Sequence, residues 1–303
     1  MMETIISVQE LTKVYGDKRV VDGVSFTVNK AEIFGLLGPN GAGKTTILEC
    51  LEGLRIPESG SMSIMGVDPI REPGRLRSLI GVQLQSGGLP ATIKVREAMQ
   101  FFSAYHKVTP RMDLLERLNL AEKREAEYHT LSTGQQRRLA LALAVAHEPP
   151  VLFLDEPTAG LDVASRTELH RLMIELKEAG TTIILSTHDM AEAEEMADRV
   201  AILLRGRIVT VGTPRELTAT GSGFTKISVR TVNNSTKGVS LPSVVKQLTR
   251  EDYNIFYTHE IGPSVTAIIA CIEQNRDTLI DLRVERPTLE ERFLELTKEG
   301  AVR

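Results

Sequence analysis

The stretch GPNGAGKT, residues 38–45, decides the fold of this chain. It matches the pattern of a phosphate-binding loop, in which two glycines five positions apart precede a lysine and a hydroxyl residue, here Lys44 and Thr45. The apolar segment 33–37 before it predicts a buried strand, and segment 46–51 after it predicts a helix. A glycine-rich backbone can wrap a phosphate closely, and the helix N-terminus presents N–H groups to it. A glycine-rich turn that binds nothing would not require the lysine and hydroxyl pair.

Length and composition indicate a soluble globular protein of about two domains. The chain has 303 residues, of which 42% are hydrophobic and 25% charged. Its longest apolar run, 139–146, is far shorter than the roughly 18 residues that a membrane helix needs. The N-terminal residues lack the basic start and apolar core of a secretory signal. We therefore expect a cytoplasmic protein that does not cross the bilayer by itself.

Cysteine content and charge exclude two further classes of protein. Cys50 and Cys271 are the two cysteines and lie far apart in the sequence, so no disulfide framework is predicted. The net charge is −4 and aromatic residues make up 4% of the chain. A nucleic-acid partner is not expected, because its binding surface would need a basic face or aromatic stacking platforms.

The first part of the chain predicts a small antiparallel sheet beside the phosphate loop. Segments 5–11 and 24–28 have strand composition, and a turn separates them. Tyr15 falls at this turn and is expected to be exposed. After the loop helix, segment 61–65 is predicted as a further short strand. Segment 79–84 predicts a further strand, followed by Gln85 and a glycine-rich hinge.

A helical insertion is expected at about 90–148. Apolar residues recur there at spacings of three and four, as in a helix that faces a core. Within it, a helix is predicted to begin near Ser132 and to stop before Pro149. The methionines and phenylalanines of the insertion are interpreted as core residues rather than as a cofactor pocket.

Residues 151–211 predict further strands, which would belong to a parallel sheet. Segment 151–154 is continuously apolar, as expected of a central strand, and it is followed by Asp155 and Glu156. Carboxylates at that end of a strand lie where ligands bind in open α/β sheets. A helix at 163–179, a strand at 181–186 leading to His188, and a hairpin at 200–211 complete the domain.

The predicted domains are 1–218 and a small accessory domain at 224–303. Pro214 and the small polar residues of 218–223 are interpreted as the linker. Thr288 and Glu291 form a capping box that opens the last helix. The strands predicted in the second domain are 224–230, 254–258, 265–270 and 279–284.

Four further motifs accompany the phosphate loop. They are LSTGQQRRL at 131–139, LFLDEP at 152–157, AGLD at 159–162 and STHD at 186–189. Together with Tyr15 and Gln85, these motifs resemble the ATP-binding cassette (ABC) ATPases over roughly residues 3–215. The tail, PTLEERFLELT at 287–297, resembles the C-terminal extension of ATPases that power bacterial exporters of drugs, antibiotics or polysaccharides. The resemblance implies an α/β fold: a P-loop NTPase cassette with an antiparallel β subdomain and a helical subdomain, plus a small α+β C-terminal domain.

The resemblance assigns catalytic and metal-binding roles to five residues. It implies that Glu156 polarises the attacking water and that His188 contacts the γ phosphate of ATP. Thr45 and Asp155 would act on Mg²⁺. Gln85 would touch the metal or the water and report the nucleotide state to a membrane partner. These residues would be sufficient for ATP hydrolysis, because phosphoryl transfer depends on positioning and charge stabilisation more than on covalent chemistry.

The resemblance also implies a nucleotide site shared between two chains. Tyr15 would stack on adenine, and the phosphates would be held by Gly38, Pro39, Asn40, Gly41, Ala42, Gly43, Lys44, Thr45 and Thr46. The γ phosphate of ATP on a second copy, or on a homologous cassette, would be bound by Ser132, Gly134, Gln135 and Asp162. The helix that follows Ser132 supplies the positive end of its dipole to that anion. Two cassettes would therefore sandwich two ATP molecules.

Two positions depart from the pattern of the family. Thr133 stands where a glycine is usual, so the backbone there must avoid positive φ and the side chain must be accommodated. Ala31 stands where a glycine commonly precedes the strand at 33–37, and we expect this change to affect only the turn.

The function expected from these observations is ATP hydrolysis that drives an exporter. The partners would be membrane-spanning subunits, which places the chain at the inner face of the cell membrane. A soluble cassette protein acting on ribosomes or DNA is the alternative, but such proteins usually carry two cassettes, coiled-coil arms or basic stretches. A nucleotide-binding regulator without turnover is a third possibility, which the presence of Glu156 argues against.

Overall fold

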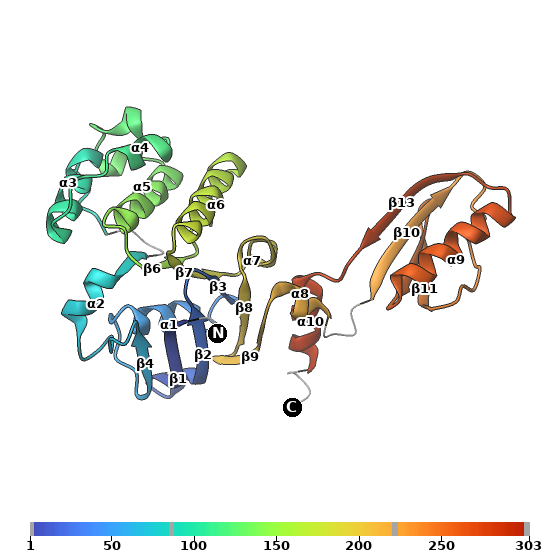
Figure 1. Ribbon diagram of the computed structural model, residues 1–303, viewed down its shortest axis with the longest axis horizontal. Helices are drawn as coiled ribbons and strands as arrows, with labels where there is room; N and C mark the ends of the chain where they lie inside the picture. The colour runs from blue at the N-terminus through green and yellow to red at the C-terminus, as the bar shows by residue number, and fades with distance from the viewer. Residues whose placement is uncertain (1–2, 85–87, 220–223, 300–303) are drawn as a thin grey trace. The chain divides into compact units, whose positions relative to one another are not determined.

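The computed structural model describes residues 3–84, 88–219 and 224–299 (Figure 1). The chain divides into two compact units, Met1–Pro214 and Arg215–Arg303. None of the helices within these described ranges is both long and apolar enough to cross a bilayer.

The first unit contains a three-stranded antiparallel sheet. Its strands are β1 (Thr4–Tyr15), β2 (Lys18–Asn29) and β4 (Ser59–Ile64), in the order β2-β1-β4. The antiparallel layer predicted from the sequence is confirmed, and its first two strands are longer than predicted. Ala31, in the turn after β2, has a φ of 53°. An alanine there adopts a conformation that glycine enters without steric cost.

A six-stranded sheet forms the centre of the unit, in the order β5-β6-β7-β3-β8-β9. Five of its strands are parallel, and only β9 runs antiparallel to its neighbour β8. The bounds are β3 Ile33–Leu37, β5 Ile80–Gln83, β6 Val151–Asp155, β7 Thr182–Thr187, β8 Arg199–Leu204 and β9 Arg207–Gly212. Every residue of β3, β6 and β7 is buried, which explains the apolar sequence of β3 and the apolar runs 151–154 and 183–185 within β6 and β7.

Helices connect these strands and form a separate group in the insertion. Figure 1 shows α3, α4 and α5 gathered at the end of the unit opposite β1, β2 and β4. The insertion contains α3 (Val95–His106), α4 (Asp113–Arg117), two short 3₁₀ helices at Ala121–Lys123 and Tyr128–Thr130, and α5 (Thr133–Val145). The remaining helices of the unit are α1 (Lys44–Leu51), α2 (Pro73–Leu79), α6 (Val163–Glu178) and α7 (Met190–Met196). Neither α2 nor α7 was predicted from the sequence.

One hydrophobic core joins the two sheets to helix α1. It includes Ile47, Leu48 and Leu51 of α1 together with residues of both sheets. The rings of Phe26 and Phe34, one from each sheet, stack with centroids 5.2 Å apart. Burial on both sides fixes the direction of α1, and with it the phosphate loop at its N-terminus.

The second unit has a four-stranded antiparallel sheet in the order β11-β12-β10-β13. Its small core consists of Ile227, Val229, Phe256, Ile268 and Ile272. Thr288 and Glu291 form the predicted capping box, each accepting the backbone N–H of the other. The elements of this unit are β10 Thr225–Thr231, β11 Val244–Arg250, β12 Tyr253–Thr258, α9 Ile261–Gln274, β13 Leu279–Glu285 and α10 Leu289–Glu299, preceded by α8 at Pro214–Ala219.

Three predictions for this part of the chain were wrong. The segment 265–270, predicted as a strand, lies within helix α9. Its buried residues, Ser264, Ile268, Cys271 and Ile272, follow the spacing of a helix, which outweighs the strand preference of its β-branched residues. Strand β11 was missed, and the N-terminal part of the predicted linker forms helix α8.

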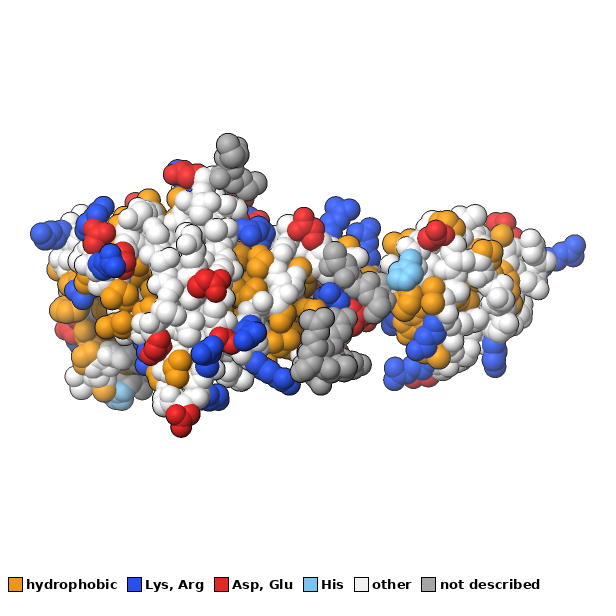
Figure 2. Space-filling view, turned by 90° about the horizontal axis from the view of Figure 1, so that it is seen from below, with side chains coloured by type: hydrophobic (Ala, Val, Ile, Leu, Met, Phe, Trp, Pro, Cys, Tyr) orange, Lys and Arg blue, Asp and Glu red, His pale blue; other side chains and the backbone are white. Residues whose placement is uncertain are grey.

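Both cysteines are free, in agreement with the prediction of no disulfide framework, and both are buried. Burial raises the pKa of the Cys50 thiol to about 11. On the face of the first unit seen in Figure 2, basic and acidic side chains are interspersed among hydrophobic ones. That arrangement agrees with a formal net charge of only −4.

Candidate functional site

The carboxyl ends of three parallel strands meet at the phosphate loop. In the sheet register, Leu37 of β3 pairs with Thr187 of β7, and Ser186 of β7 pairs with Asp155 of β6. The loop that follows Leu37 therefore begins beside the ends of β6 and β7. This is the edge at which open α/β sheets bind ligands.

Glycine is required at two positions of the loop by geometry. Gly43 caps α1 with a φ of 108°, and a Cβ there would lie 2.7 Å from the backbone oxygen of Val20. A Cβ on Gly38 would lie 2.4 Å from the backbone oxygen of Leu203. The loop is thus packed tightly from behind, while its residues Pro39, Asn40, Gly41 and Thr45 are exposed. Ala42 is buried and Thr46 is half-buried.

Lys44 lies inside the loop. Its side chain is 5% exposed, and its Nζ donates hydrogen bonds to the backbone oxygens of Gly38 at 2.8 Å and Pro39 at 3.3 Å. The same Nζ lies 3.6 Å from Oε1 of Glu156. Burial lowers the pKa of Lys44, and the neighbouring carboxylates Glu156 and Asp155 oppose that shift. The ammonium group is therefore held where an anion in the loop would meet it.

Asp155 and Glu156 end strand β6 with different surroundings. Asp155 is 3% exposed, and its Oδ1 accepts a hydrogen bond from the Ser186 hydroxyl. Glu156 has a φ of 48°, an uncommon conformation for a residue with a side chain. Its backbone N–H donates to the Ser186 backbone oxygen at 3.1 Å. Ser186 thus orients both acids, a role that we did not predict from the STHD motif.

The carboxylate of Glu156 contacts two other predicted site residues. Its Oε1 lies 3.1 Å from Nδ1 of His188, as well as 3.6 Å from Lys44. The residues Lys44, Asp155, Glu156 and His188 come from three separate segments of the sequence, yet the structure brings them together. A base, a cation and a second acid are therefore close enough to act on one phosphate group.

The LSTGQ segment forms the start of helix α5. Ser132 caps this helix: its Oγ accepts the N–H of Gln135 at 3.3 Å, and Oε1 of Gln135 accepts the N–H of Ser132 at 2.9 Å. Thr133 is exposed in the first turn, with no positive φ, as the sequence required. A Cβ on Gly134 would lie 3.4 Å from Cδ2 of Leu161, so this turn packs against the AGLD segment.

Asp162 begins the next helix beside that segment. It caps α6, with its carboxylate accepting the N–H of Ser165 at 2.9 Å and the hydroxyl of Ser165 at 2.8 Å. These bonds lower the pKa of Asp162. Within the described residues, no hydrogen bond joins Ser132, Gly134 or Asp162 to the phosphate loop. The two halves of the predicted nucleotide site are therefore not joined by hydrogen bonds within one chain.

Arg137 links helix α5 to the acids. Its guanidinium donates a hydrogen bond to the backbone oxygen of Glu156. A movement of α5 would therefore be transmitted to the peptide that carries Glu156. Arg137 belongs to the LSTGQQRRL motif, but its sequence position predicts no function for it, because its partner is a backbone atom 19 positions away.

Tyr15 lies at the end of β1 and is 40% exposed, as predicted. Two cations flank its ring: Nζ of Lys13 lies 5.3 Å from the ring centroid, and Cζ of Arg55 lies 5.4 Å from it. An exposed aromatic face next to positive charge suits a planar, phosphate-bearing ligand.

The residues predicted for a metal provide hard oxygen ligands. The Thr45 hydroxyl lies in the first turn of α1, and the Asp155 carboxylate ends β6. Gln85, the third predicted ligand, lies outside the described residues. No group of three His, Cys, Asp or Glu side chains in the described ranges could form a metal cage. Mg²⁺ is usually held by one or two protein oxygens together with phosphates, so Thr45 and Asp155 fit this ion.

A buried network behind the site connects α6 and α7. Glu192, 3% exposed, accepts a hydrogen bond from the Thr158 hydroxyl at 2.7 Å and lies 3.2 Å from Nε2 of His170. Burial raises the pKa of Glu192, but hydrogen bonds, chiefly that of His170, outweigh this and hold it below its usual value. The network fixes Thr158, two positions after Glu156, against the helix that follows His188.

This network predicts a pH-dependent contribution to stability. A carboxyl whose pKa is lowered on folding stabilises the native state above its unfolded pKa, and this stabilisation is lost as pH falls through the folded value. We expect the Glu192→Gln chain to lose less unfolding free energy than the wild type when urea denaturation at pH 7 is repeated at pH 4. Glu178→Gln, at an exposed position, is the control and should behave like the wild type. An equal loss in Glu192→Gln and wild type would contradict the role of the network.

Comparisons with known proteins show which family this chain belongs to. A family model described as "ABC transporter" matches residues 21–159. The chain is 33% identical over 306 residues to the daunorubicin resistance ATP-binding protein DrrA3 of Streptomyces coeruleorubidus, spanning 98% of this chain and 97% of that protein. It is 42% identical over 219 residues to the Nod factor export ATP-binding protein I of Rhizobium meliloti, spanning 70% of this chain and 65% of that protein.

The fold is also similar to solved structures. A structure described as the ATP binding subunit of an ABC transporter superposes with a TM-score of 0.66 at 28% sequence identity. The match covers 70% of this chain and 91% of that one.

Proposed function

The chain belongs to the ABC transporter ATPases, and from that premise we propose how its site handles ATP and which partners complete it. It is the ATP-binding and ATP-hydrolysing subunit of an ABC exporter, and the relatives above are ATP-binding proteins of daunorubicin resistance and of Nod factor export. The observation that carries the mechanism is the contact of Glu156 with both Lys44 and His188 at the mouth of the phosphate loop.

ATP binding begins with an exchange of partners at Lys44. We propose that the β and γ phosphates enter the loop of residues 38–46 and accept hydrogen bonds from the N–H groups at the start of α1. They replace the backbone oxygens of Gly38 and Pro39, and the Glu156 carboxylate, as partners of the ammonium group. Tyr15 stacks on the adenine ring. Binding therefore frees Glu156 for catalysis.

Hydrolysis then needs a base beside the γ phosphate. Glu156 accepts a proton from a water molecule whose oxygen attacks the γ phosphorus, and the bond from that phosphorus to the β–γ bridging oxygen breaks. His188 contacts the Glu156 carboxylate through its Nδ1 and, when both ring nitrogens carry a proton, would donate its other N–H to the γ phosphate. Ser186 and Arg137 fix the backbone of Glu156, so that little reorganisation precedes the step.

Thr45, Asp155 and Gln85 would hold Mg²⁺ beside the phosphates. When bound, the ion neutralises phosphate charge and orients the oxygens around the γ phosphorus. The hydrogen bond from Ser186 to Asp155 keeps one carboxylate oxygen occupied and leaves the other for the ion or its water.

A second chain completes the site. Ser132, Gly134 and Gln135 at the N-terminus of α5, with Asp162 beside them, would contact the γ phosphate of ATP held by the facing chain. Support comes from the N-terminus of α5, where Ser132 and Thr133 are exposed and the N–H groups of Thr133 and Gly134 precede the first backbone hydrogen bond of the helix. We propose a symmetric pair of cassettes, formed with a second copy or a homologous chain.

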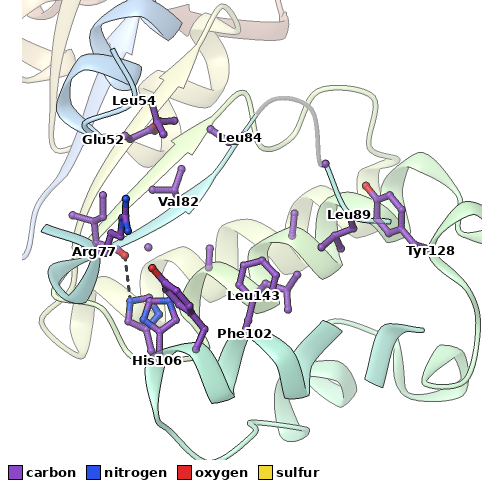
Figure 3. A pocket seen from close by; sticks show the side chains of 17 residues that line it. Glu52, Leu54, Arg77, Val82, Leu84, Leu89, Phe102, His106, Tyr128 and Leu143 are labelled. Carbon is purple, nitrogen blue, oxygen red and sulfur yellow. Dashed lines mark hydrogen bonds between the residues drawn. The ribbon is translucent and has the colours of Figure 1, made fainter. Parts of the chain in front are cut away.

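The other partners are membrane-spanning subunits, which would hold the chain at the inner face of the cell membrane. We place their docking surface at a hollow of about 450 Å³ in the first unit, between the end of α1, strand β5 and helices α3 and α5 (Figure 3). The hollow is mostly apolar, and Leu84 and Gly88 on its wall flank the segment that contains Gln85. A soluble role on ribosomes or DNA has no support from the relatives compared above.

Co-expression tests the choice of partner. We expect the tagged chain to copurify with six-helix membrane proteins that lack their own cassette and are encoded beside its gene. Its ATP turnover should respond to their presence. A chain that is recovered only with ribosomes or DNA, and never with such membrane proteins, would contradict the exporter.

A further inference from the structure

The hollow contains a buried carboxylate, that of Glu52, for which the described residues provide no hydrogen-bond partner. Glu52 is 7% exposed and lines the hollow, and neither of its carboxylate oxygens has a hydrogen-bond partner in the described part of the chain. Most of the other lining residues are apolar, among them Leu54, Ile80, Phe102 and Leu143. Buried carboxylates are normally paired, so an unpaired one needs an explanation.

The position of Glu52 at the C-terminus of helix α1 further disfavours its ionised form. Glu52 is the C-cap of α1, where the negative end of the helix dipole disfavours a carboxylate. Burial, followed by the repulsion of Asp155 and Glu49, raises the pKa of Glu52 to about 8. Every neighbouring influence thus acts against the negative charge, and a cation would be stabilised at the same place.

Among the described residues that line the hollow, no cation forms an ion pair with Glu52. His106 and His147 stack with ring centroids 3.7 Å apart on the wall formed by α3 and α5. Burial lowers the pKa of both rings, that of His147 to about 4, so both are neutral near pH 7. Arg77 at the rim is exposed, and no ion pair joins it to Glu52 among the described residues.

Figure 3 shows Glu52 and Leu54 at the end of α1, across the hollow from Phe102, His106 and Leu143. An apolar segment lying in the hollow would contact both walls. A basic side chain on that segment would meet the carboxylate of Glu52 and the terminal carbonyls of α1 together.

We propose that Glu52 is the residue by which the hollow selects its partner, pairing with a single lysine or arginine on an otherwise apolar docking segment of the membrane subunit. The proposal rests on the exporter function proposed above. It explains why an acid stays at a position where folding alone would favour an apolar or neutral residue. Pairing with the partner would remove the cost that Glu52 imposes on the isolated chain.

The first test measures the cost of the unpaired acid. An acid whose pKa is raised on folding destabilises the native state as pH rises from the unfolded pKa, 4.5, towards the folded one. Thermal unfolding of the full chain at pH 8 should therefore give a higher midpoint for Glu52→Gln than for wild type. A lower midpoint would mean that Glu52 has a stabilising partner within the chain, and would overturn the proposal.

The second test measures selection by charge. The probes are 4-phenylbutylammonium, 4-phenylbutanol and 4-phenylbutyrate, titrated by calorimetry into the full chain at pH 8. We expect the ammonium to bind wild type about tenfold or more tightly than the alcohol, since hydrogen bonds to charged groups are the stronger ones, and the butyrate to bind most weakly. This preference should disappear in Glu52→Gln.

The control variant is Glu49→Gln. Glu49 belongs to the same helix but pairs with Arg55 and does not line the hollow, so this chain should keep the preference for the ammonium. Equal binding of ammonium and alcohol to wild type, or a preference that survives in Glu52→Gln, would overturn the proposal. Tighter binding of the butyrate would assign recognition to Arg77 instead. Because the probes need no ATP, a failure here would leave the ATPase function standing.

Discussion

A Glu156→Gln chain is expected to bind ATP but to hydrolyse it at least about a hundredfold more slowly than wild type. Glutamine has nearly the same shape and can keep the contact with His188, but it cannot accept the proton of the attacking water. ATP should therefore persist at the interface and hold two chains together. Size-exclusion chromatography with ATP and Mg²⁺ should show a dimer, and phosphate release should show the slow turnover.

The matched control is Glu116→Gln, which removes a surface carboxylate that pairs with Arg124, away from the strand ends. It should hydrolyse ATP at the wild-type rate. A Glu156→Gln chain that stays monomeric with ATP and hydrolyses it normally would refute the role of Glu156 as the base.

A Lys44→Ala chain should lose ATP hydrolysis, with a decrease of about a hundredfold or more. The alanine removes a buried ammonium group from the centre of the phosphate loop, where it faces Glu156 and the backbone oxygen of Gly38. Nucleotide binding should weaken as well, because the same charge is used in the ground state. Unlike Glu156→Gln, this chain should not accumulate an ATP-bound dimer.

Lys30→Ala serves as the control, since Lys30 pairs with Glu3 on the surface. Turnover is measured by phosphate release, and binding by titration with a fluorescent ATP analogue. Turnover close to wild type in the Lys44→Ala chain would show that residues 38–45 are not the catalytic phosphate loop.

The central sheet could be predicted because its strands carry an unambiguous pattern. Segment 151–154 is apolar at every position and is followed by two acids. This pattern is typical of a central strand that is buried on both faces. The phosphate loop was equally predictable from its sequence motif. The structure explains two of its glycines, because a Cβ at position 38 or 43 would clash with backbone atoms. Local sequence and tertiary packing agree at these places.

Other features depend on pairing that the sequence does not display. Ser186 contacts the acid at the end of the neighbouring strand, and Arg137 donates to a backbone oxygen. Glu192 contacts His170 on another helix. Helix α9 was mistaken for a strand because its β-branched residues favour a strand locally, whereas burial against the second core requires a helical period. Glu52 gave no signal in the sequence, since only the folded chain shows that it is buried with no hydrogen-bond partner among the described residues.

The composite site can be tested by mixing two inactive chains. A Lys44→Ala chain lacks a working phosphate loop, and a Ser132→Arg chain blocks the cap of α5 that would face the ATP of the other chain. Circular dichroism first establishes that both are folded. In a mixed dimer, the intact loop of one chain faces the intact α5 cap of the other, so one complete site forms.

The decisive measurement is the ATP turnover of an equimolar mixture of these two chains. Each chain alone should be inactive, and the mixture should recover roughly a quarter of the wild-type rate. Random pairing makes half of the dimers mixed, and in each mixed dimer one of the two sites is complete. A mixture as inactive as its components would contradict a nucleotide site shared between two copies of this chain.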